Sequence, residues 1–308
     1  MLSDREKQVV SETIASSEHD YFVWSSLLGE PFVVDGFICY FDGVTAAIAG
    51  VPLADGRPRN GIRSRLDRVV DKWMQRPDVD FVNYFGPEHL AVARNPSFGL
   101  IYKQEPADYN LDLFIELGSG PDTRASRKLR QDLNRAVRNG IEVEARKQEF
   151  LTAEQLRLMS QLAARTDLEV SDVTYLANAA ALLRHDSSML FEARLGDAVA
   201  GVGIAHHYFT SKPFFVVAAF DSRLAGVSDA IYAAVISYYR LHGAEWLGLG
   251  YAATAGQYHY KHKWGGEARN SPCWQLIWRR CNIATPFRDS LHWPWRLLSD
   301  KWCSIVQA

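Results

Sequence analysis

The chain has 308 residues, of which 47% are hydrophobic and 23% are charged, and a net charge of −2, so it is long enough for two ordinary domains. No apolar run approaches the roughly 20 residues that cross a bilayer, and no signal-peptide core follows the polar residues 1–7. The cysteines lack Cys-x-x-Cys spacing and the histidines lack a His-Glu-x-x-His run. We therefore expect a cytoplasmic α/β protein without a metal centre and without stable membrane association.

The first half of the chain predicts a mixed α/β domain. Two strand-like runs flank Asp42-Gly43, a turn pair typical of β-hairpins. The elements are predicted in this order: helix 3–15, strands 31–41 and 44–53, helix 61–75, and strands 78–85, 98–103 and 110–117. The sequence Gly-Ser-Gly-Pro at residues 118–121 then breaks the chain, which places a domain boundary near residue 120.

The second half runs through a comparable order. Its predicted elements are helices 151–164 and 172–184, strands 189–195, 198–206 and 212–220, helix 228–242, strand 246–250, a short helix 257–263 and strand 274–278. The segments 41–51 and 195–205 both join a Gly/Asp turn to an apolar strand of small residues. Two readings stay open, an internal duplication or the alternation that any α/β protein shows.

A basic helix is predicted between the halves, over residues 123–139. Residues three, four and seven apart share a helix face, and one face carries Arg124, Arg127, Lys128, Gln131, Arg135 and Arg138. The opposite side carries the apolar residues Leu129, Leu133, Ala136 and Val137. Five cations on one stripe repel one another, and a polyanionic partner would relieve that repulsion. A plain solvated face is the alternative.

A candidate anion site precedes the helix predicted at 228–242. There Arg223, Gly226 and Ser228 form an Arg-x-x-Gly-x-Ser loop. Small residues at a helix N-terminus leave backbone N–H groups and the positive end of the helix dipole available to a pyrophosphate or another anion. The alternative is a simple turn in which Ser228 caps the helix.

A candidate catalytic segment follows the strand 246–250, where glycines allow close approach of a ligand. It places cations beside aromatic residues, in the order Tyr260, Lys261, His262, Lys263 and Trp264. A lysine in a partly apolar place could stabilise an oxyanion during acyl transfer, and His259 or His262 could act as a base near neutral pH. A helix anchored by its aromatic residues, with solvated lysines, is the alternative.

These residues resemble the GNAT superfamily, and more closely its Fem-like, aminoacyl-tRNA-dependent branch. The family pattern aromatic-Lys-x-x-aromatic-Gly is matched by the run from Tyr260 to Gly265. The segment 126–144 is similar to the basic helix and strand that open the second domain in this branch, and to the corresponding part of phosphatidylglycerol lysyltransferase catalytic domains. The resemblance covers about residues 123–278; before that, only the order of elements fits.

The resemblance implies two tandem GNAT-like domains, 1–120 and 121–308, each with a mixed, mostly antiparallel sheet flanked by helices. The predicted catalytic residues are Lys261, which would stabilise the oxyanion, with Tyr260 and His262 beside it. The predicted donor-binding residues are Arg223, Gly226, Ser228 and Tyr251. The predicted tRNA-binding residues are Arg124, Arg127, Lys128, Arg135, Arg138 and Lys263. The predicted acceptor-binding residues, in the first domain, are Asn83, Tyr84 and Glu88.

The expected function is transfer of an amino acid from aminoacyl-tRNA, as a co-substrate, to an amine or hydroxyl of a small-molecule acceptor in specialised metabolism. No bound cofactor is expected. Ser228 stands where acyl-CoA-binding members usually carry glycine or alanine, and neither the helical arm of cell-wall ligases nor the membrane domain of lipid-modifying enzymes is found. Two alternatives are an acyl-CoA-dependent N-acyltransferase and a non-catalytic protein that binds RNA or a partner.

The C-terminal residues 286–308 form an aromatic tail. It carries Trp293, Trp295 and Trp302 among leucine, isoleucine and valine residues. We expect the tail to pack back over a domain, since Pro294 would interrupt a long helix. An interfacial helix that seeks a membrane or a partner is the alternative.

Overall fold

The computed structural model describes residues 31–41, 43–52, 61–90, 95–109, 111–118, 127–165, 180, 182–207, 213–252, 254–268 and 274–281. The predicted helix 3–15, most of the predicted helix 172–184 and the aromatic tail lie outside this part of the chain. The chain divides into two compact units: unit 1 holds the six-stranded sheet, and unit 2 holds most of the seven-stranded sheet. Residues 249–262 and 266–283 group with unit 1, whereas residues 263–265 group with unit 2.

Unit 1 contains a mixed sheet with the strand order β1-β2-β3-β4-β13-β5. Its elements are β1 (Pro31–Val34), β2 (Phe37–Phe41), β3 (Thr45–Pro52), α3 (Ile62–Gln75), β4 (Phe81–Gly86), β5 (Phe98–Gln104) and β13 (Trp274–Arg280). The run predicted as one strand at 31–41 is two antiparallel strands, because Asp35 and Gly36 adopt positive φ angles of 52° and 83° and turn the chain between them.

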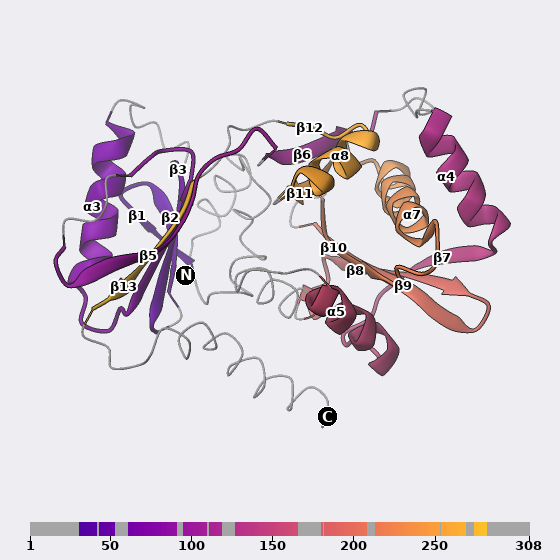
Figure 1. The fold of residues 1–308 in the computed structure, drawn as a ribbon, viewed down its shortest axis with the longest axis horizontal. Helices are drawn as coiled ribbons and strands as arrows, with labels where there is room; N and C mark the ends of the chain where they lie inside the picture. The colour runs from indigo at the N-terminus through magenta and orange to yellow at the C-terminus, as the bar shows by residue number, and fades with distance from the viewer. Residues whose placement is uncertain are drawn as a thin grey trace. The chain divides into compact units, whose positions relative to one another are not determined.

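The last described strand, β13, lies between β4 and β5 and pairs antiparallel with both (Figure 1). It comes from the C-terminal half of the sequence but completes the sheet of unit 1. Leu276 and Trp278 of β13 are 3% and 1% exposed and belong to the core of this unit. The sequence predicts this strand but not the sheet to which it belongs.

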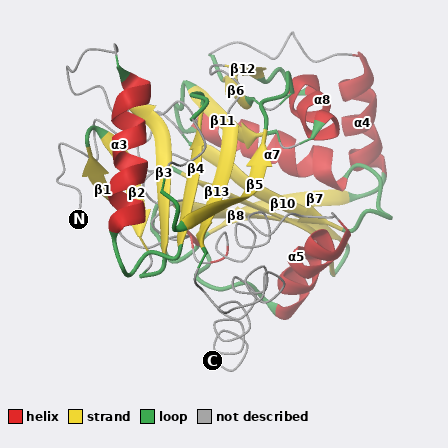
Figure 2. Ribbon diagram, turned by 60° about the vertical axis from the view of Figure 1, so that its left-hand side comes forward, coloured by secondary structure: helices red, strands yellow, loops and turns green. Residues whose placement is uncertain are grey.

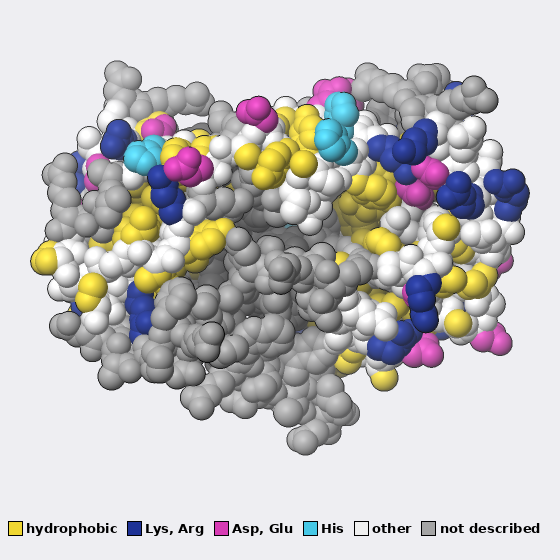
Figure 3. All heavy atoms as spheres, viewed as in Figure 1, with side chains coloured by type: hydrophobic (Ala, Val, Ile, Leu, Met, Phe, Trp, Pro, Cys, Tyr) yellow, Lys and Arg dark blue, Asp and Glu magenta, His cyan; other side chains and the backbone are white. Residues whose placement is uncertain are grey.

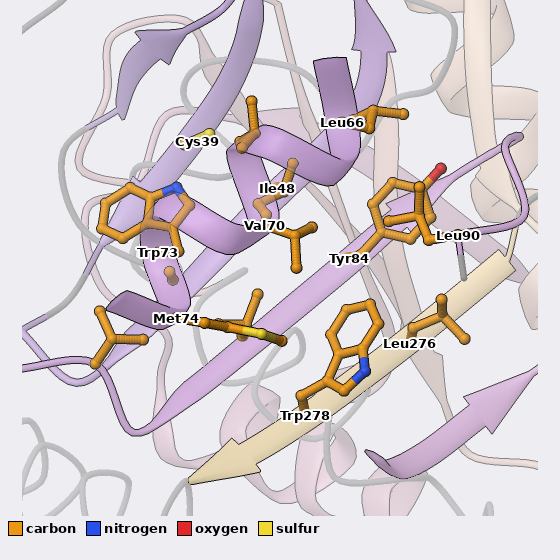
Figure 4. Packing of buried hydrophobic residues seen from close by; sticks show 14 of the residues in the cluster. Cys39, Ile48, Leu66, Val70, Trp73, Met74, Tyr84, Leu90, Leu276 and Trp278 are labelled. Carbon is orange, nitrogen blue, oxygen red and sulfur yellow. The ribbon is translucent and has the colours of Figure 1, made fainter. Parts of the chain in front are cut away.

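Helix α3 covers one face of the unit 1 sheet (Figure 2). It begins after Gly61, whose φ of 78° suits glycine, and it ends at Arg76, which is extended because Pro77 follows. Its buried face presents Leu66, Val70 and Trp73 to the sheet, where they pack with Tyr84 and Trp278 (Figure 4). Each such side chain contributes about 1.5–3 kcal/mol by leaving water.

The larger sheet has the order β12-β6-β11-β10-β9-β8-β7. The elements around it are β6 (Asp112–Glu116), α4 (Arg127–Arg138), β7 (Ile141–Arg146), α5 (Ala153–Arg165), β8 (Ser188–Leu195), β9 (Ala198–His206), β10 (Phe214–Phe220), α7 (Val227–Leu241), β11 (Trp246–Tyr251), α8 (Ala255–Lys263) and β12 (Glu267–Ala268). The predicted hairpin of β8 and β9 is confirmed, with Gly196 at a φ of 58° in its turn.

Two helices pack on opposite faces of this sheet. A Cβ atom on Gly201 or Gly203 of β9 would approach the side chains of Val227 and Ile231 to 2.6 and 2.7 Å, so α7 lies directly against these glycines. Val202 lies between these two glycines, so it and its cross-strand partner Glu192 of β8 face the other side of the sheet. Glu192 accepts a hydrogen bond from Gln155 of α5, and α5 therefore covers that side. The result is a three-layer arrangement, visible in Figure 1.

Both sheets contain the same run of elements. In each, an antiparallel pair (β2 with β3, β9 with β10) is followed by a helix and then by a strand parallel to the second member of the pair (β4, β11). The counterpart of the hairpin over 41–51 is thus β9–β10 rather than the 195–205 hairpin. The predicted class, two mixed and mostly antiparallel sheets flanked by helices, is confirmed. No helix in the described residues is long and apolar enough to cross a bilayer.

Candidate functional site

The loop that leads into α7 has the geometry of a helix start without a side-chain cap. Gly226 is the N-cap at a φ of 94° and provides no side-chain cap, and Ser228 lies within the helix, which begins at Val227, so Ser228 is not the N-cap. A helix N-terminus without a side-chain cap suits an anion through its backbone N–H groups. Gly226 also has a packing role, because a Cβ atom here would lie 3.0 Å from the Cα and Cβ atoms of Ala136 in α4.

Arg223 is held by a neighbouring carboxylate. Its Nε and Nη2 donate to Oδ1 and Oδ2 of Asp221 at 2.9 and 2.6 Å, while the arginine side chain remains 82% exposed. The side-chain hydrogen bond from Arg223 lowers the pKa of Asp221 to about 2, so this carboxylate is charged at neutral pH. A donor phosphate would share the guanidinium with Asp221.

Helix α4 carries the basic face that the sequence predicts. Lys128, Arg135 and Arg138 are exposed, while Leu129 and Ala136 are 1% and 3% exposed on the opposite side. Figure 3 shows Lys and Arg side chains gathered over this helix. Arg124 and the side chain of Arg127 lie outside the described residues. The expectation that Val137 packs on a core is wrong: it is 75% exposed, because the buried stripe follows positions 129, 133 and 136.

Lys263, at the end of α8, is bound between two carboxylates. Its Nζ donates to Asp132 of α4 and to Asp229 in the first turn of α7, each at 2.8 Å. The three side chains are 18%, 19% and 10% exposed, respectively. Burial lowers the pKa of Lys263, but the bonds to Asp132 and Asp229 outweigh it and the pKa is raised overall. This ammonium is engaged inside the protein, which leaves little of it for the predicted contact with tRNA.

Lys261, two residues earlier, is half-buried. Its Nζ donates to the carbonyl oxygen of Gly250 at 2.9 Å, at the end of β11. Gly250 has a φ of 76°, a backbone conformation that glycine adopts readily. Tyr260 is also half-buried, whereas the side chain of Tyr251 lies outside the described residues.

His262 is exposed, and its ring is oriented by the turn that follows α8. Nδ1 lies 3.1 Å from the carbonyl oxygen of Gly266, and since a carbonyl only accepts, Nδ1 carries the proton. Nε2 of the neutral ring is then an acceptor, as a general base requires. The ring also stacks on Tyr258 at a centroid distance of 5.8 Å. Gly266 itself is required by packing, because a Cβ atom would come within 2.8 Å of the Lys261 carbonyl oxygen.

The three candidate acceptor residues of unit 1 have different environments. Tyr84 is fully buried; its hydroxyl donates to the carbonyl of Glu88 at 2.9 Å and accepts from the Glu88 N–H at 3.1 Å. The ring is enclosed by Gly50 and Gly86, where added Cβ atoms would approach it to 2.5 and 2.6 Å. These contacts assign Tyr84 to the core. Asn83 is half-buried, and its Oδ1 has no hydrogen-bond partner within the described ranges.

Sequence reasoning misses the acids that organise these segments. Asp221 binds Arg223, and Asp132 and Asp229 bind Lys263, although all three are plain in the sequence. Asp132 is the one acid within α4, an oddity in a basic helix that could have pointed to a cationic partner. Within the described part of the chain, no group of His, Cys, Asp and Glu could hold a metal ion.

No family model and no curated protein matches this sequence. Solved structures do match. A conserved protein of unknown function from Bacteroides thetaiotaomicron has a TM-score of 0.56 at 10% identity, over 90% of this chain and 98% of its own. FemX has a TM-score of 0.54 at 11% identity, over 89% and 96% of the two chains. The C-terminal domain of a putative lysylphosphatidylglycerol synthetase from Agrobacterium fabrum has 0.49 at 12%, over 89% and 92%.

These comparisons define the fold class. The chain shares its fold with FemX. The resemblance that the motif around Lys261 indicates is confirmed at the level of the fold. The roles of the individual residues, and the boundary at residue 120, remain predictions.

Proposed function

We propose that this protein is an acyltransferase that moves an amino acid from aminoacyl-tRNA to an amine or hydroxyl of a small-molecule acceptor. The observation that carries the proposal is the junction of α4 and α7. Ala136 packs against Gly226, so α4, whose exposed face is basic, lies next to the start of α7 within one unit. An RNA backbone gains from such a cationic face through counterion release, and a phosphate gains from the helix N-terminus. The structural likeness to FemX supports the same class.

The chemistry requires no covalent enzyme intermediate. The acceptor nitrogen or oxygen attacks the carbonyl carbon of the aminoacyl ester, and negative charge develops on the carbonyl oxygen. The bond to the ribose oxygen then breaks; the acceptor loses a proton and the ribose oxygen gains one. Lys261 would stabilise the oxyanion and Nε2 of His262 would accept the acceptor's proton, roles consistent with the ammonium at Gly250 and the ring orientation set by Gly266.

The direct test is incubation with tRNA charged with radiolabelled amino acids and a panel of amine and hydroxyl acceptors. We expect loss of label from tRNA and its appearance in a small product, both abolished by prior RNase treatment. Loss of label at the same rate without protein would contradict the proposal.

Lys261→Ala should lower the rate of transfer by about 10²–10³, the usual cost of one oxyanion-stabilising group. Lys72→Ala is the matched control, because Lys72 lies on α3, which carries no predicted site residue, and is 60% exposed. Equal rates for the two variants would remove Lys261 from the mechanism.

A second candidate function is acyl-CoA-dependent N-acyl transfer. The start of α7 favours it specifically, since the Arg223–Ser228 loop leaves first-turn amides for a pyrophosphate. Saturating acetyl-CoA would then raise the melting temperature by mass action, whereas uncharged tRNA would not. A protein that binds tRNA in a salt-sensitive manner without turnover would instead be a binding protein.

A further inference from the structure

We propose that Lys263 limits the negative charge at the donor-binding surface of unit 2 by offsetting one of the two charges of Asp132 and Asp229, and does so without contacting the donor. That a donor binds at this surface rests on the proposed function. Lys263 is thus a positioning residue, whose effect on an anionic ligand passes through two carboxylates. The sequence alone suggests the opposite, a lysine that touches RNA.

The geometry gives the first step. One ammonium lies 2.8 Å from a carboxylate oxygen of each aspartate, and its own side chain is 18% exposed. Two of its three N–H donors are used by these bonds. A phosphate outside would meet the little-exposed end of a side chain that already has two anionic partners.

The distribution of charge gives the second step. Helix α4 contains five basic residues and a single acid, Asp132. Asp229 is likewise the one acid in the first turn of α7. Each carboxylate therefore lies at a place where an anionic donor is expected, and each would repel it. The hydrogen bond from Lys263 lowers the pKa of Asp132, and the ammonium offsets one of the two negative charges.

The third step separates neutralisation from direct contact. Without Lys263, two partly buried carboxylates would lose the ammonium that both of them bind, next to Gly226 and α4. Loss of the ammonium would make the local charge more negative, which would weaken anion binding as the loss of a direct contact would. It would also destabilise the packing. Neutralising the two acids as well would undo the damage. A lysine that contacts RNA directly could not be rescued in this way.

The experiment compares four proteins: wild type, Lys263→Met, the triple variant Lys263→Met/Asp132→Asn/Asp229→Asn, and Arg138→Met. Unfractionated uncharged tRNA is the probe, with binding followed by fluorescence anisotropy at two salt concentrations. We expect Lys263→Met to weaken binding about tenfold or more, Arg138→Met to weaken it less, and the triple variant, whose cluster is neutral, to bind at least as tightly as wild type. A triple variant as weak as Lys263→Met would overturn the inference.

Urea unfolding of the same proteins tests the contact independently of RNA. Lys263→Met should lower the denaturation midpoint, and the triple variant should recover most of the loss; no recovery would overturn the neutralising role. Absence of tRNA binding by wild type would refute the proposed function alone, since the unfolding comparison would still decide the role of Lys263. If Lys263→Met does not fold, Asp132→Asn/Asp229→Asn replaces it: tighter tRNA binding than wild type supports neutralisation, and weaker binding contradicts it.

Discussion

Two parallel strand pairs in the described part of the chain are joined to different extents. In unit 1, β3 and β4 pair over five positions, from Thr45↔Phe81 to Ala49↔Phe85, and the Tyr84 ring fills the end between Gly50 and Gly86. Between β10 and β11 the described register consists of one pair, Phe214↔Gly248. In unit 1, the end of this strand–helix–strand element is thus filled by one of its own side chains.

The helices that follow β3 and β10 also begin alike and continue differently. Both α3 and α7 start at a glycine with positive φ, Gly61 and Gly226, and neither start has a side-chain cap among the described residues. Only the start of α7 packs against a basic helix, α4. A helix start shared by both units therefore does not indicate a function by itself. The elements packed against that start distinguish the two units. The donor belongs, in our proposal, to unit 2.

The largest effect on stability is expected from the strand that crosses from the C-terminal half into unit 1. Trp278→Ala should cost about 3–5 kcal/mol in the free energy of unfolding, since the indole is 1% exposed in the core of that unit. Urea denaturation monitored by circular dichroism measures the loss. Leu241→Ala, at a residue that is 84% exposed, is the control and should change little. Equal stabilities would show that β13 is dispensable.

The two helix starts provide a sharper comparison. Gly61→Ala should cost about 1–2 kcal/mol, because its φ of 78° is strained for alanine while nothing lies within 4 Å of the new Cβ. Gly226→Ala should cost more, about 2–4 kcal/mol, because its Cβ would also lie 3.0 Å from Ala136. Thermal unfolding of both variants tests the order. If Gly61→Ala were the worse of the two, the close packing of α4 on α7 would be in error.

Tyr84→Phe tests whether unit 1 is closed at this strand end. Removing the hydroxyl leaves the N–H and carbonyl of Glu88 without their partner, which should cost about 1–3 kcal/mol. Chemical denaturation gives the cost, with Tyr109→Phe, at an exposed tyrosine, as the matched control. A raised KM for the acceptor with unchanged stability would restore Tyr84 to the acceptor site that the sequence predicts.

The smallest effect concerns the pH dependence of Asp221. Its pKa of about 2 in the folded protein is below the ordinary 3.8, chiefly because Arg223 donates a side-chain hydrogen bond. A lowered folded-state pKa gives stabilisation that is complete above about pH 4 and is lost as the pH falls toward 2. Carboxyl NMR titration should show the low midpoint in wild type and a higher one in Arg223→Gln. A wild-type midpoint near 4 would exclude the ion pair.

Much of the fold follows from sequence because local patterns determine it. The periodicity and turn residues place α3, β8, β9, α7 and β11 within a few residues of their bounds. What the sequence does not reveal is non-local. The sheet that β13 joins depends on pairing across nearly 200 residues, between Trp278 and Val82, and no local signal specifies it.

The candidate site shows the same division. The basic face of α4 is visible as a helical stripe, and Lys261 is visible in a motif. The bonds from Lys263 to Asp132 and Asp229 span 131 and 34 residues, so charge counting along one helix could not assign them. The sequence therefore predicts a surface cation at Lys263, whereas in the folded protein Lys263 is a little-exposed partner of two acids.

Hydrogen–deuterium exchange with a non-hydrolysable aminoacyl-tRNA analogue tests the assignment of the donor to unit 2 most directly. We predict protection of the amides of α4, residues 127–138, and of the first turn of α7, with no change in the first turn of α3. Protection confined to α3, or no protection in either helix of unit 2 at saturating analogue, would contradict it.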